Sequence, residues 1–379
     1  MSQVSFDLDQ YLSELKPLIN TDCGTYTPAG VTKIADLMTE KYESIGWQVT
    51  RHPLNEKVGP ALIATNKPEA EEYDVLMIGH LDTVFPEGTV AKWSLTTDGE
   101  KAYGPGVADM KSGQLNMFMA SRALPADVSD RMSIAVLMNP DEEIGSVYSG
   151  DLVRSMAKKS RCVLVAEAAR VDGSLVKARK GMAHYAVEIS GKAAHAGNEP
   201  QNGVSAITEL AHWITTLNKE TNFETGTTLN FGTVTGGTGS NVVPDFASTD
   251  LDIRFWNNDD YAVLEKQIAE MVATPSLAGI SINLIRKAYK PAFTPSEDGK
   301  KLMAVIEKSG QDMGLDITWQ AVGGGSDANL TGALGVPTID GLGPIGGGMH
   351  SHNEFLVLGS IEPRLNLLRN VLINLAEKA

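Results

Sequence analysis

Residues that can hold a metal ion or transfer a proton recur after short apolar runs in this sequence. The runs at 75–79, 134–138, 162–166 and 336–339 are followed by imidazole or carboxylate side chains, namely His80 and Asp82, Glu142 and Glu143, Glu167, and finally His350. Imidazole nitrogens and carboxylate oxygens are ligands of borderline or hard divalent ions such as zinc, cobalt and manganese. The recurrence therefore predicts a metallohydrolase.

The apolar runs also predict the structure that brings these residues together. Runs rich in Val, Ile and Leu are typical of strands buried on both faces of a mostly parallel sheet, as in an α/β fold. Such sheets bind ligands at the edge formed by the carboxyl ends of their strands. We therefore expect the polar residues to converge on one edge of the sheet.

Each of these positions, taken alone, has an ordinary alternative. The pair His80 and Asp82 is a weak signal by itself, and Asp109, in the glycine-rich segment 104–113, would also cap a helix that begins near Gly113. The carboxylates at 141–143 and Glu167 suit solvated turns as well, the former at the start of a helix. The metal site is favoured because all of these alternatives would have to hold at once.

Length, charge and cysteine content narrow the class of protein. A chain of 379 residues is longer than one hydrophobic core usually supports, so two domains are expected. A net charge of −15, without any Lys/Arg-rich run, argues against a nucleic-acid partner. No apolar run approaches the roughly 18 residues of a membrane span, and residues 1–12 contain Asp7 and Asp9 where a secretory signal would be basic and apolar. Because Cys23 and Cys162 are the only cysteines, we expect no disulfide framework. Together, these features predict no membrane partner and a cytoplasmic location.

The order of the predicted elements divides the chain into two domains. A helical opening segment at 6–46 leads into strands and helices that alternate as far as Glu167, which is typical of an α/β sheet domain. The order then becomes β-α-β-β-α-β, with strands at 182–189, 228–234, 246–255 and 280–285 and helices at 204–217 and 261–272. That order is typical of a ferredoxin-like unit. We expect residues 1–180 and 290–379 to form one domain and 181–289 to form a second, inserted domain, with hinges near Lys180 and Tyr289.

Four motifs resemble those of the M20 metallopeptidase family, and of the glutamate carboxypeptidase group within it. They are GHLDTV at 79–84, GPGVADMKSG at 104–113, DEEIGS at 141–146 and AAHAG at 193–197. The resemblance extends over nearly the whole chain. It implies a zinc-peptidase-like catalytic domain and an inserted ferredoxin-like domain that serves for dimerisation and as a lid, hence a homodimer.

The resemblance further implies a dinuclear zinc site, with cobalt or manganese as alternative ions. Asp109 would bridge the two ions, His80 and Glu167 would complete one of them, and Glu143 and His350 the other. Two ions about 3.5–4 Å apart can hold a water between them and lower its pKa.

Three further residues would act in the reaction that the resemblance implies. Glu142 would be the general base on that water and would later deliver the proton to the leaving amine. Asp82 would orient His80 through its second ring nitrogen. His195 would reach the active site of the other subunit and stabilise the oxyanion. Without the resemblance, His195 is more simply interpreted as a loop residue before Pro200.

Residues 349–354 offer two histidines as metal ligand. His350 stands four residues before Glu354, as the family's ligand stands before a glutamate, so His350 is preferred to His352.

Residues that contact the substrate are predicted from weaker signals. Asn241 and Arg254 resemble family positions that touch the substrate, and Gly324 and Gly325 could present backbone N–H groups to a carboxylate, with a simple turn as an equal alternative. Lys290 stands where glutamate-specific relatives tend to carry Arg. Because Lys cannot make the planar bidentate pair that Arg makes with a carboxylate, strict glutamate specificity is in doubt.

The predicted reaction is hydrolysis of an amide bond that releases a C-terminal, glutamate-type amino acid from a small peptide or an N-acyl amino acid. An N-acyl-amino-acid deacylase or a dipeptidase of the same family is the alternative within this chemistry. A metal-dependent binding protein without turnover is the alternative outside it. The presence of Glu142 and His195 favours an enzyme.

Overall fold

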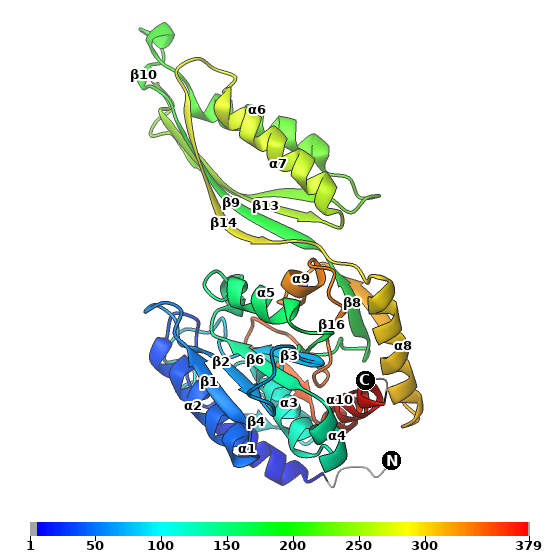
Figure 1. Cartoon of the computed structure of the whole chain (residues 1–379). Helices are drawn as coiled ribbons and strands as arrows, with labels where there is room; N and C mark the ends of the chain where they lie inside the picture. Colours follow the sequence, from blue (N-terminus) through cyan, green and yellow to red (C-terminus); the bar gives the residue numbers. More distant parts are fainter. Residues whose placement is uncertain (1–5, 378–379) are drawn as a thin grey trace. The chain divides into compact units, whose positions relative to one another are not determined.

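The computed structural model describes residues 6–377, which divide into two compact units. Arg179–Phe293 and Gly323–Gly325 form one of them, called the inserted unit, and the other described residues form the large unit. The predicted insertion, residues 181–289, lies inside the inserted unit. In Figure 1 the inserted unit is drawn mainly in green and yellow.

A six-stranded sheet forms the centre of the large unit, with its strands in the order β1-β2-β6-β3-β7-β16. The strands β6, β3, β7 and β16 run parallel, whereas β2 pairs antiparallel with β6 and β1 antiparallel with β2. The strands are Gln48–His52 (β1), Ala61–Thr65 (β2), Val75–His80 (β3), Ile134–Asn139 (β6), Val163–Val165 (β7) and Thr338–Ile339 (β16). The predicted α/β fold with a mostly parallel central sheet is confirmed.

The parallel strands are short apolar segments that are buried along their whole length. Every residue of β3, β6, β7 and β16 is buried, as expected for strands that are covered on both faces. The long helices α3 and α10 are buried around most of their circumference and contact each other. The helices of the large unit are Leu8–Ile19 (α1), Pro28–Ser44 (α2), Ser112–Arg122 (α3), Ala126–Arg131 (α4), Gly150–Lys158 (α5), Glu297–Gln311 (α8), Ala328–Gly332 (α9) and Ile361–Ala376 (α10).

The opening helical segment consists of two helices, which the sequence pattern alone did not separate. Helix α1 begins after Asp7, whose side chain accepts a hydrogen bond from the backbone N–H of Gln10. Helix α2 begins at Pro28, a residue type favoured in the first helical turn, and ends shortly before Gly46, where φ is +80°. The segment between the two helices is irregular and lies against the end of β3, because the backbone N–H of Thr83 donates to the carbonyl of Cys23.

Two smaller sheets accompany the central sheet. One has the order β17-β18-β5-β4 and consists of Thr96–Thr97 (β4), Lys101–Tyr103 (β5), Gly346–Gly347 (β17) and Phe355–Val357 (β18). The other pairs Leu175–Arg179 (β8) with Trp319–Val322 (β15). The strand expected at 336–339 is β16, which ends at Ile339, and His350, expected beyond it, lies in the β17–β18 hairpin.

The inserted unit is an antiparallel four-stranded sheet with two long helices. The sheet order is β11-β13-β9-β14, and the chain order β-α-β-β-α-β is the predicted one. Its elements are Gly181–Ser190 (β9), Ala206–Leu217 (α6), Thr228–Gly236 (β11), Phe246–Phe255 (β13), Asn258–Ala273 (α7) and Ser281–Lys290 (β14). Alternate residues of β9 and β13 are buried together with Trp213 of α6, which gives this unit a core of its own.

Two features of the inserted unit differ from the sequence pattern. The last strand continues through Tyr289 to Lys290, so the segment expected as a hinge is the end of β14. A short ribbon of Ala194–His195 (β10) and Val242–Val243 (β12) also pairs outside the main sheet. Strands of two residues are too short for an alternating pattern to reveal them.

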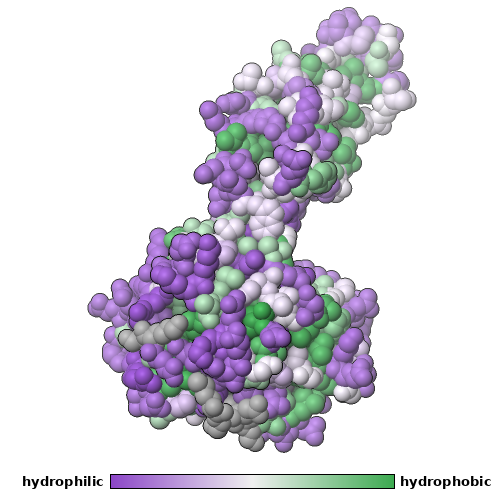
Figure 2. Space-filling view, turned by 90° about the vertical axis from the view of Figure 1, so that its right-hand side faces the viewer, coloured by the Kyte–Doolittle hydropathy of each residue, from purple (hydrophilic) through white to green (hydrophobic). Residues whose placement is uncertain are grey.

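The surface view and the helices bear on the expected absence of a membrane span. On the face shown in Figure 2, hydrophilic residues cover much of each unit, with smaller hydrophobic patches between them. Among residues 6–377, no helix has both the length and the apolar character needed to cross a membrane.

Candidate active site

The five predicted metal ligands lie together in the large unit. His80 is the last residue of β3, Glu143 lies in the short helical turn after β6, and Glu167 follows β7. Asp109 lies in the segment that follows β5, and His350 in the β17–β18 hairpin. The pairing of β18 with β5 brings the loops that carry Asp109 and His350 close to each other. His80, Glu143 and Glu167 lie at the carboxyl ends of the three neighbouring parallel strands β3, β6 and β7.

The carboxylate of Asp109 divides this group into two halves. Its Oδ1 is 2.9 Å from Nε2 of His80, and that nitrogen is 3.6 Å from Oε1 of Glu167. Its Oδ2 is 3.3 Å from Nε2 of His350, which in turn is 3.1 Å from Oε2 of Glu143. Each half therefore combines one imidazole, one glutamate and one oxygen of the shared aspartate.

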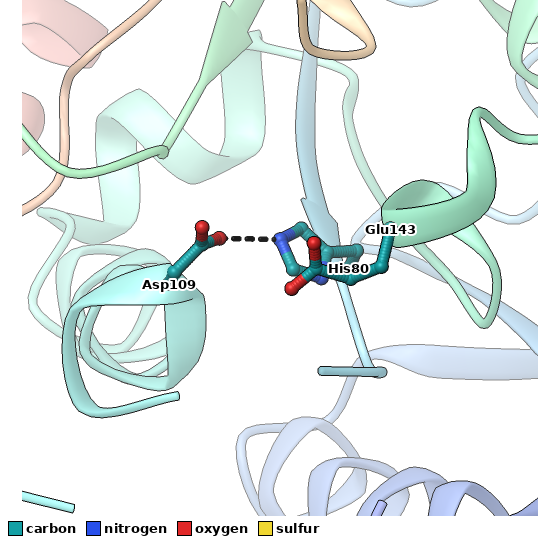
Figure 3. Close-up of side chains that lie close together, drawn as sticks. All are labelled: His80, Asp109 and Glu143. Carbon is teal, nitrogen blue, oxygen red and sulfur yellow. Dashed lines mark hydrogen bonds and ion pairs between the residues drawn. The ribbon is translucent and has the colours of Figure 1, made fainter. Parts of the chain in front are cut away.

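The donor atoms have the spacing and the chemistry of a cation site. Figure 3 shows the side chains of His80, Asp109 and Glu143 converging from three separate segments. One potential ligand atom of each lies within 4.8 Å of those of the other two. Nitrogen and carboxylate oxygen donors suit zinc, cobalt and manganese. The residues present thus fit the binding of a divalent cation beside Asp109.

Asp82 fixes the orientation of the His80 ring. Its backbone carbonyl oxygen is 3.1 Å and its Oδ1 3.2 Å from Nδ1 of His80, so the opposite nitrogen, Nε2, faces Asp109. Its Oδ2 accepts a hydrogen bond of 2.6 Å from the Thr25 hydroxyl and one of 3.3 Å from the backbone N–H of Glu143. This fully buried carboxylate therefore links both halves of the site.

Glu354 holds the segment that carries Asp109. Its carboxylate is fully buried and accepts hydrogen bonds from the backbone N–H groups of Gly106 at 3.1 Å, Ala108 at 2.8 Å and Asp109 at 3.0 Å. Burial raises the pKa of Glu354 to about 8, although these N–H groups act in the opposite direction. The sequence drew attention to Glu354 only as a marker for His350.

The charges of the two halves depend on one another. Burial and the charge of Asp109 raise the pKa of Glu143 to about 7 and that of Glu167 well above its usual value. Burial disfavours ionised Asp109 as well, but hydrogen bonds from His350 and His80 hold its pKa below the usual range. A bound cation would relieve the repulsion that raises the pKa of the two glutamates.

The two imidazoles show the complementary shift. Burial opposes a charge on His80, but its contacts with Asp109 and Asp82 raise its pKa well above the usual value. Hydrogen bonds to Asp109 and Glu143 raise the pKa of His350 to about 10. Without a metal, these contacts therefore favour the protonated form of both imidazoles.

Glu142 lies beside both halves of the group. It is half-buried in the turn after β6, and its negative charge contributes to the raised pKa of both Glu143 and Glu167. A carboxylate in this position can exchange a proton with a molecule held at the site.

The two histidines of residues 349–354 have different surroundings. His350 contacts Asp109 and Glu143, as described above. The ring of His352 instead packs against Trp93 at 5.0 Å and Phe85 at 6.2 Å between ring centres. Of the two, His350 is thus the one next to the carboxylates.

His195 and Asn241 lie close together in the inserted unit. His195 is exposed on β10, and its Nδ1 accepts the backbone N–H groups of Gly197 and Asn198, each at 3.1 Å. The carbonyl of Asn241 accepts the N–H of Ala196 at 2.9 Å. Because Nδ1 is an acceptor, the proton of the neutral ring is on Nε2, which makes that atom a hydrogen-bond donor.

The other predicted substrate residues also belong to the inserted unit. Arg254 makes a two-point ion pair with Asp252, with distances of 2.8 and 2.9 Å, and Lys290 is buried. The carbonyl of Gly324, next to Gly325, accepts a hydrogen bond of 2.9 Å from Arg179. This pair uses Nε and Nη2 of Arg254 and partly neutralises the charge that a substrate carboxylate would meet.

Most of the sequence, including both units, matches a known peptidase family. The model of Peptidase family M20/M25/M40 matches residues 76–374, which include all five predicted ligands. The chain belongs to this family. The prediction of an M20 metallo-exopeptidase is thereby confirmed at the level of the family.

Individual relatives of this M20 peptidase cover most of its length. Carboxypeptidase G2 of Pseudomonas sp. strain RS-16 is 30% identical over 372 residues, which are 96% of this chain and 89% of the relative. Succinyl-diaminopimelate desuccinylase of Acidovorax ebreus strain TPSY is 28% identical over 339 residues, 82% of this chain and 83% of the relative.

Solved structures share the fold of the M20 peptidase. Aminopeptidase PepT of Bacillus cereus ATCC 10987 superimposes with a TM-score of 0.78 at 24% identity, covering 98% of this chain and 99% of the other. The YXEP protein of Bacillus subtilis, described as a dinuclear metal binding peptidase from the M20 family, has a TM-score of 0.70 at 12% identity and covers 98% of this chain and 99% of its own.

Several residues that shape the site were missed in the sequence. Thr25 donates to Asp82, Lys111 donates to the carbonyl of Leu81, and Gln114 donates to the carbonyl of His80. Lys111 and Gln114 are fully buried. The signal for both was their place just before the apolar residues Leu115, Met117, Phe118 and Met119 of a helix, where a buried polar side chain needs a partner.

Replacement of Glu354 by Gln should weaken metal binding without preventing folding. The amide offers one acceptor oxygen and turns an NH₂ group toward backbone N–H groups, so the Asp109 segment loses part of its support. We expect a metal affinity about 10–100-fold lower, the range typical of such supporting residues. Zinc titration with a competing chelator measures it, and exposed Glu297→Gln on α8 is the control. Equal zinc affinity of Glu354→Gln and the wild type would contradict this role.

The metal-free protein should lose stability as the pH rises. The pKa of Glu143 in the folded state, about 7, exceeds its usual value of 4.5, and that of His350, about 10, exceeds 6.5. Both groups therefore stabilise the folded state fully below their unfolded pKa values and lose that contribution as the pH rises through the folded ones. The thermal midpoint of chelator-treated protein should fall between pH 5 and pH 9, as measured by circular dichroism.

Two comparisons isolate the site in this experiment. Saturating zinc should reduce the fall, because cations replace the protons, and Glu143→Gln should also show a shallower fall than the wild type. A metal-free wild-type midpoint that stays level or rises over this range would refute the electrostatic description of the site.

Proposed function

We propose that this protein is a dinuclear zinc hydrolase that releases a C-terminal amino acid, of glutamate type, from an N-acyl or peptidyl substrate. The observation that carries the proposal is the two-sided environment of Asp109, with His80 and Glu167 near one oxygen and His350 and Glu143 near the other. These five residues would hold two zinc ions, with cobalt or manganese as alternatives. Membership of a peptidase family supports amide hydrolysis as the reaction.

The protein's own residues account for the proton transfers and the positioning. Bound divalent cations would supply Lewis-acid activation of water and of the scissile carbonyl. Glu142 accepts a proton from the attacking water and delivers it to the leaving nitrogen, so that one carboxylate serves first as base and then as acid. Asp82 keeps Nε2 of His80 directed at Asp109 during these steps.

His195 is proposed to stabilise the negative oxygen that develops on the substrate carbonyl. Its Nδ1 is occupied by two backbone N–H groups, so that Nε2–H is the donor available to the substrate. We propose that this histidine acts in the active site of the partner subunit of a homodimer. Asn241, held next to it, would contact the same substrate.

The amino-acid end of the substrate would be recognised by cations of the inserted unit, Arg254 and Lys290, and by backbone groups at Gly324 and Gly325. The carboxypeptidase G2 relative supports a carboxypeptidase-type reaction. The desuccinylase relative supports the second candidate, hydrolysis of an N-acyl amino acid. A cytoplasmic location stays a prediction from the sequence.

A panel of N-acylated and free-amine dipeptides, assayed with zinc, cobalt and manganese, tests the proposal and separates the two candidates. Wild-type enzyme should release a C-terminal amino acid from at least one member. Glu142→Gln should retain both metals and lose about 10²–10⁴-fold in kcat, the usual contribution of general acid–base catalysis.

Matched measurements make this test specific. Metal content by elemental analysis separates a loss of chemistry from a loss of metal, and Glu40→Gln, an exposed position on α2, should leave kcat unchanged. Near-wild-type turnover of metal-loaded Glu142→Gln would remove its role as base. Failure of the zinc-loaded wild type on the whole panel would favour a binding protein without turnover.

Mixing two inactive variants tests whether His195 acts in the partner subunit. A heterodimer of Glu142→Gln and His195→Ala has one fully wild-type site only if His195 crosses between subunits. Random exchange should then restore about a quarter of wild-type activity, because half of the dimers carry one good site of two. The same mixture should stay inactive if His195 serves its own chain. Size-exclusion chromatography with light scattering checks that the variants are dimers.

A further inference from the structure

Asp327 is a buried carboxylate of the large unit that does not belong to the predicted ligand group. It lies directly before α9, and only 1% of the residue is exposed. A carboxylate that is taken out of water depends on hydrogen-bond donors for compensation. The donors around Asp327 therefore show which part of the molecule it holds.

Asp327 holds both ends of the turn that carries Glu142 and Glu143. Its Oδ2 accepts a hydrogen bond of 2.8 Å from the side-chain amide of Asn139, the last residue of β6. Its Oδ1 accepts a hydrogen bond from the hydroxyl of Ser146. These two partners are buried and lie 188 and 181 residues away from Asp327 in the sequence. One carboxylate thus connects the residue before the turn to the residue that ends it.

The backbone of Ser146 has a conformation that few residues other than glycine adopt. Its φ is +54°, directly after Gly145, whose φ is +91°. The N–H of Ser146 donates to the carbonyl of Asp141 at 2.8 Å, so the chain reverses within residues 141–146. The hydrogen bond to Asp327 holds the Ser146 side chain in this conformation. The direction of the turn therefore depends on a contact from outside it.

Further hydrogen bonds extend this buried group beyond the turn. The amide of Asn139 also donates to the hydroxyl of Ser149 at 2.9 Å, directly before α5. Oδ2 of Asp141 accepts the backbone N–H groups of Tyr148 at 2.6 Å and Ser149 at 3.3 Å. Asp327 joins this local group from a distant part of the chain.

The segment that carries Asp327 is itself fixed to a different strand. The hydroxyl of Ser326 donates to Oδ2 of Asp340 at 2.6 Å, and Asp340 is fully buried directly after β16. Burial, the charge of Asp109 and, further, the charge of Asp340 raise the pKa of Glu167. The position of Asp327 is thus set by β16, on the side of the ligand group opposite to the turn in the order of the strands.

We infer that Asp327 is a positioning residue that acts through Asn139 and Ser146 and holds the turn of residues 140–146 so that Glu142 is directed at the substrate. The inference rests on the proposed hydrolase function, in which Glu142 transfers the proton. Asp327 takes no proton itself. Because Glu143 lies on the same turn, metal content has to be measured together with turnover.

Asp327→Asn should lower kcat about 10–100-fold at saturating zinc, with KM and metal content close to those of the wild type. The amide has nearly the same shape but turns an NH₂ group toward one of two donors, so the turn loses an attachment. A misplacement of about 1 Å can cost about 100-fold in rate. Initial rates on a cleaved member of the dipeptide panel and elemental analysis measure these quantities.

The matched control is Asp316→Asn, an exposed aspartate ahead of β15, which should leave kcat unchanged. A wild-type kcat in folded Asp327→Asn would overturn the inference.

Ser146→Gly separates positioning from stability. Glycine adopts a φ of +54° readily, so the fold should be retained while the hydroxyl that binds Asp327 is lost. The kcat should fall about as far as in Asp327→Asn, and circular dichroism checks that the protein is folded. This variant decides the question even if Asp327→Asn does not fold. An unchanged kcat would show that the contact with Asp327 serves the fold alone and would overturn the inference.

A swap of the two buried partners should rescue activity. Asn139→Asp alone places two carboxylates together, and Asp327→Asn alone places two amides together. The double variant again pairs one carboxylate with one amide, and the hydroxyls of Ser146 and Ser149 can turn to donate to either residue. Its kcat should exceed that of both single variants. A double variant without this gain would contradict the proposed link.

A double-mutant cycle tests whether Asp327 acts through Glu142. In the Glu142→Gln background, Asp327→Asn should change the residual kcat by less than about 2-fold, because the group that it positions is already missing. A full further loss would show that Asp327 acts on another group and would overturn the inference.

Crystal structures decide the positioning without turnover. In zinc-loaded Asp327→Asn, residues 140–146 should be displaced from their wild-type position while β3 and β6 superimpose. If the wild type cleaves nothing, the hydrolase proposal fails, and this comparison still tests what Asp327 holds. A turn in the wild-type position would overturn the inference.

Discussion

The large unit depends on keeping three carboxylates together in a mostly buried place. The side chains of Asp109, Glu143 and Glu167 are 17%, 4% and 13% exposed. Two like charges about 4 Å apart repel by about 4 kcal/mol at the effective dielectric of a partly buried site. Repulsion of this size would open the loops unless positive groups opposed it. The imidazoles of His80 and His350 do so in the metal-free protein, and divalent cations would do so more fully.

This constraint explains why so many buried hydrogen bonds surround the site. Glu354 fastens the Asp109 segment through three backbone N–H groups, and Asp82 joins His80 to the backbone of Glu143. Gln114 holds the carbonyl of His80 from the adjoining helix. Each contact fixes a loop that carries charge, so the ligand geometry is set by side chains that do not themselves belong to the ligand group.

The sequence predicted most directly those parts of the site that lie at the ends of apolar runs. His80, Glu143 and Glu167 come after wholly buried parallel strands, whose apolar character is visible without any structure. Asp109 and His350 lie next to β5 and β17, which are not apolar runs, so the sequence offered them as candidates and the family resemblance gave them their roles as ligands. The role of Glu354 in holding the Asp109 segment could not be predicted, because a carboxylate that accepts backbone N–H groups has no sequence signature.

The residues predicted to contact the substrate show a second limit of sequence reasoning. Arg254 was selected for its charge, but Asp252 lies two residues before it on the same face of β13 and forms a two-point pair with it. An anionic substrate must therefore compete with an internal carboxylate in a protein of net charge −15. Under the proposed function, selectivity for an acidic amino acid would have to come from a few local cations of the inserted unit.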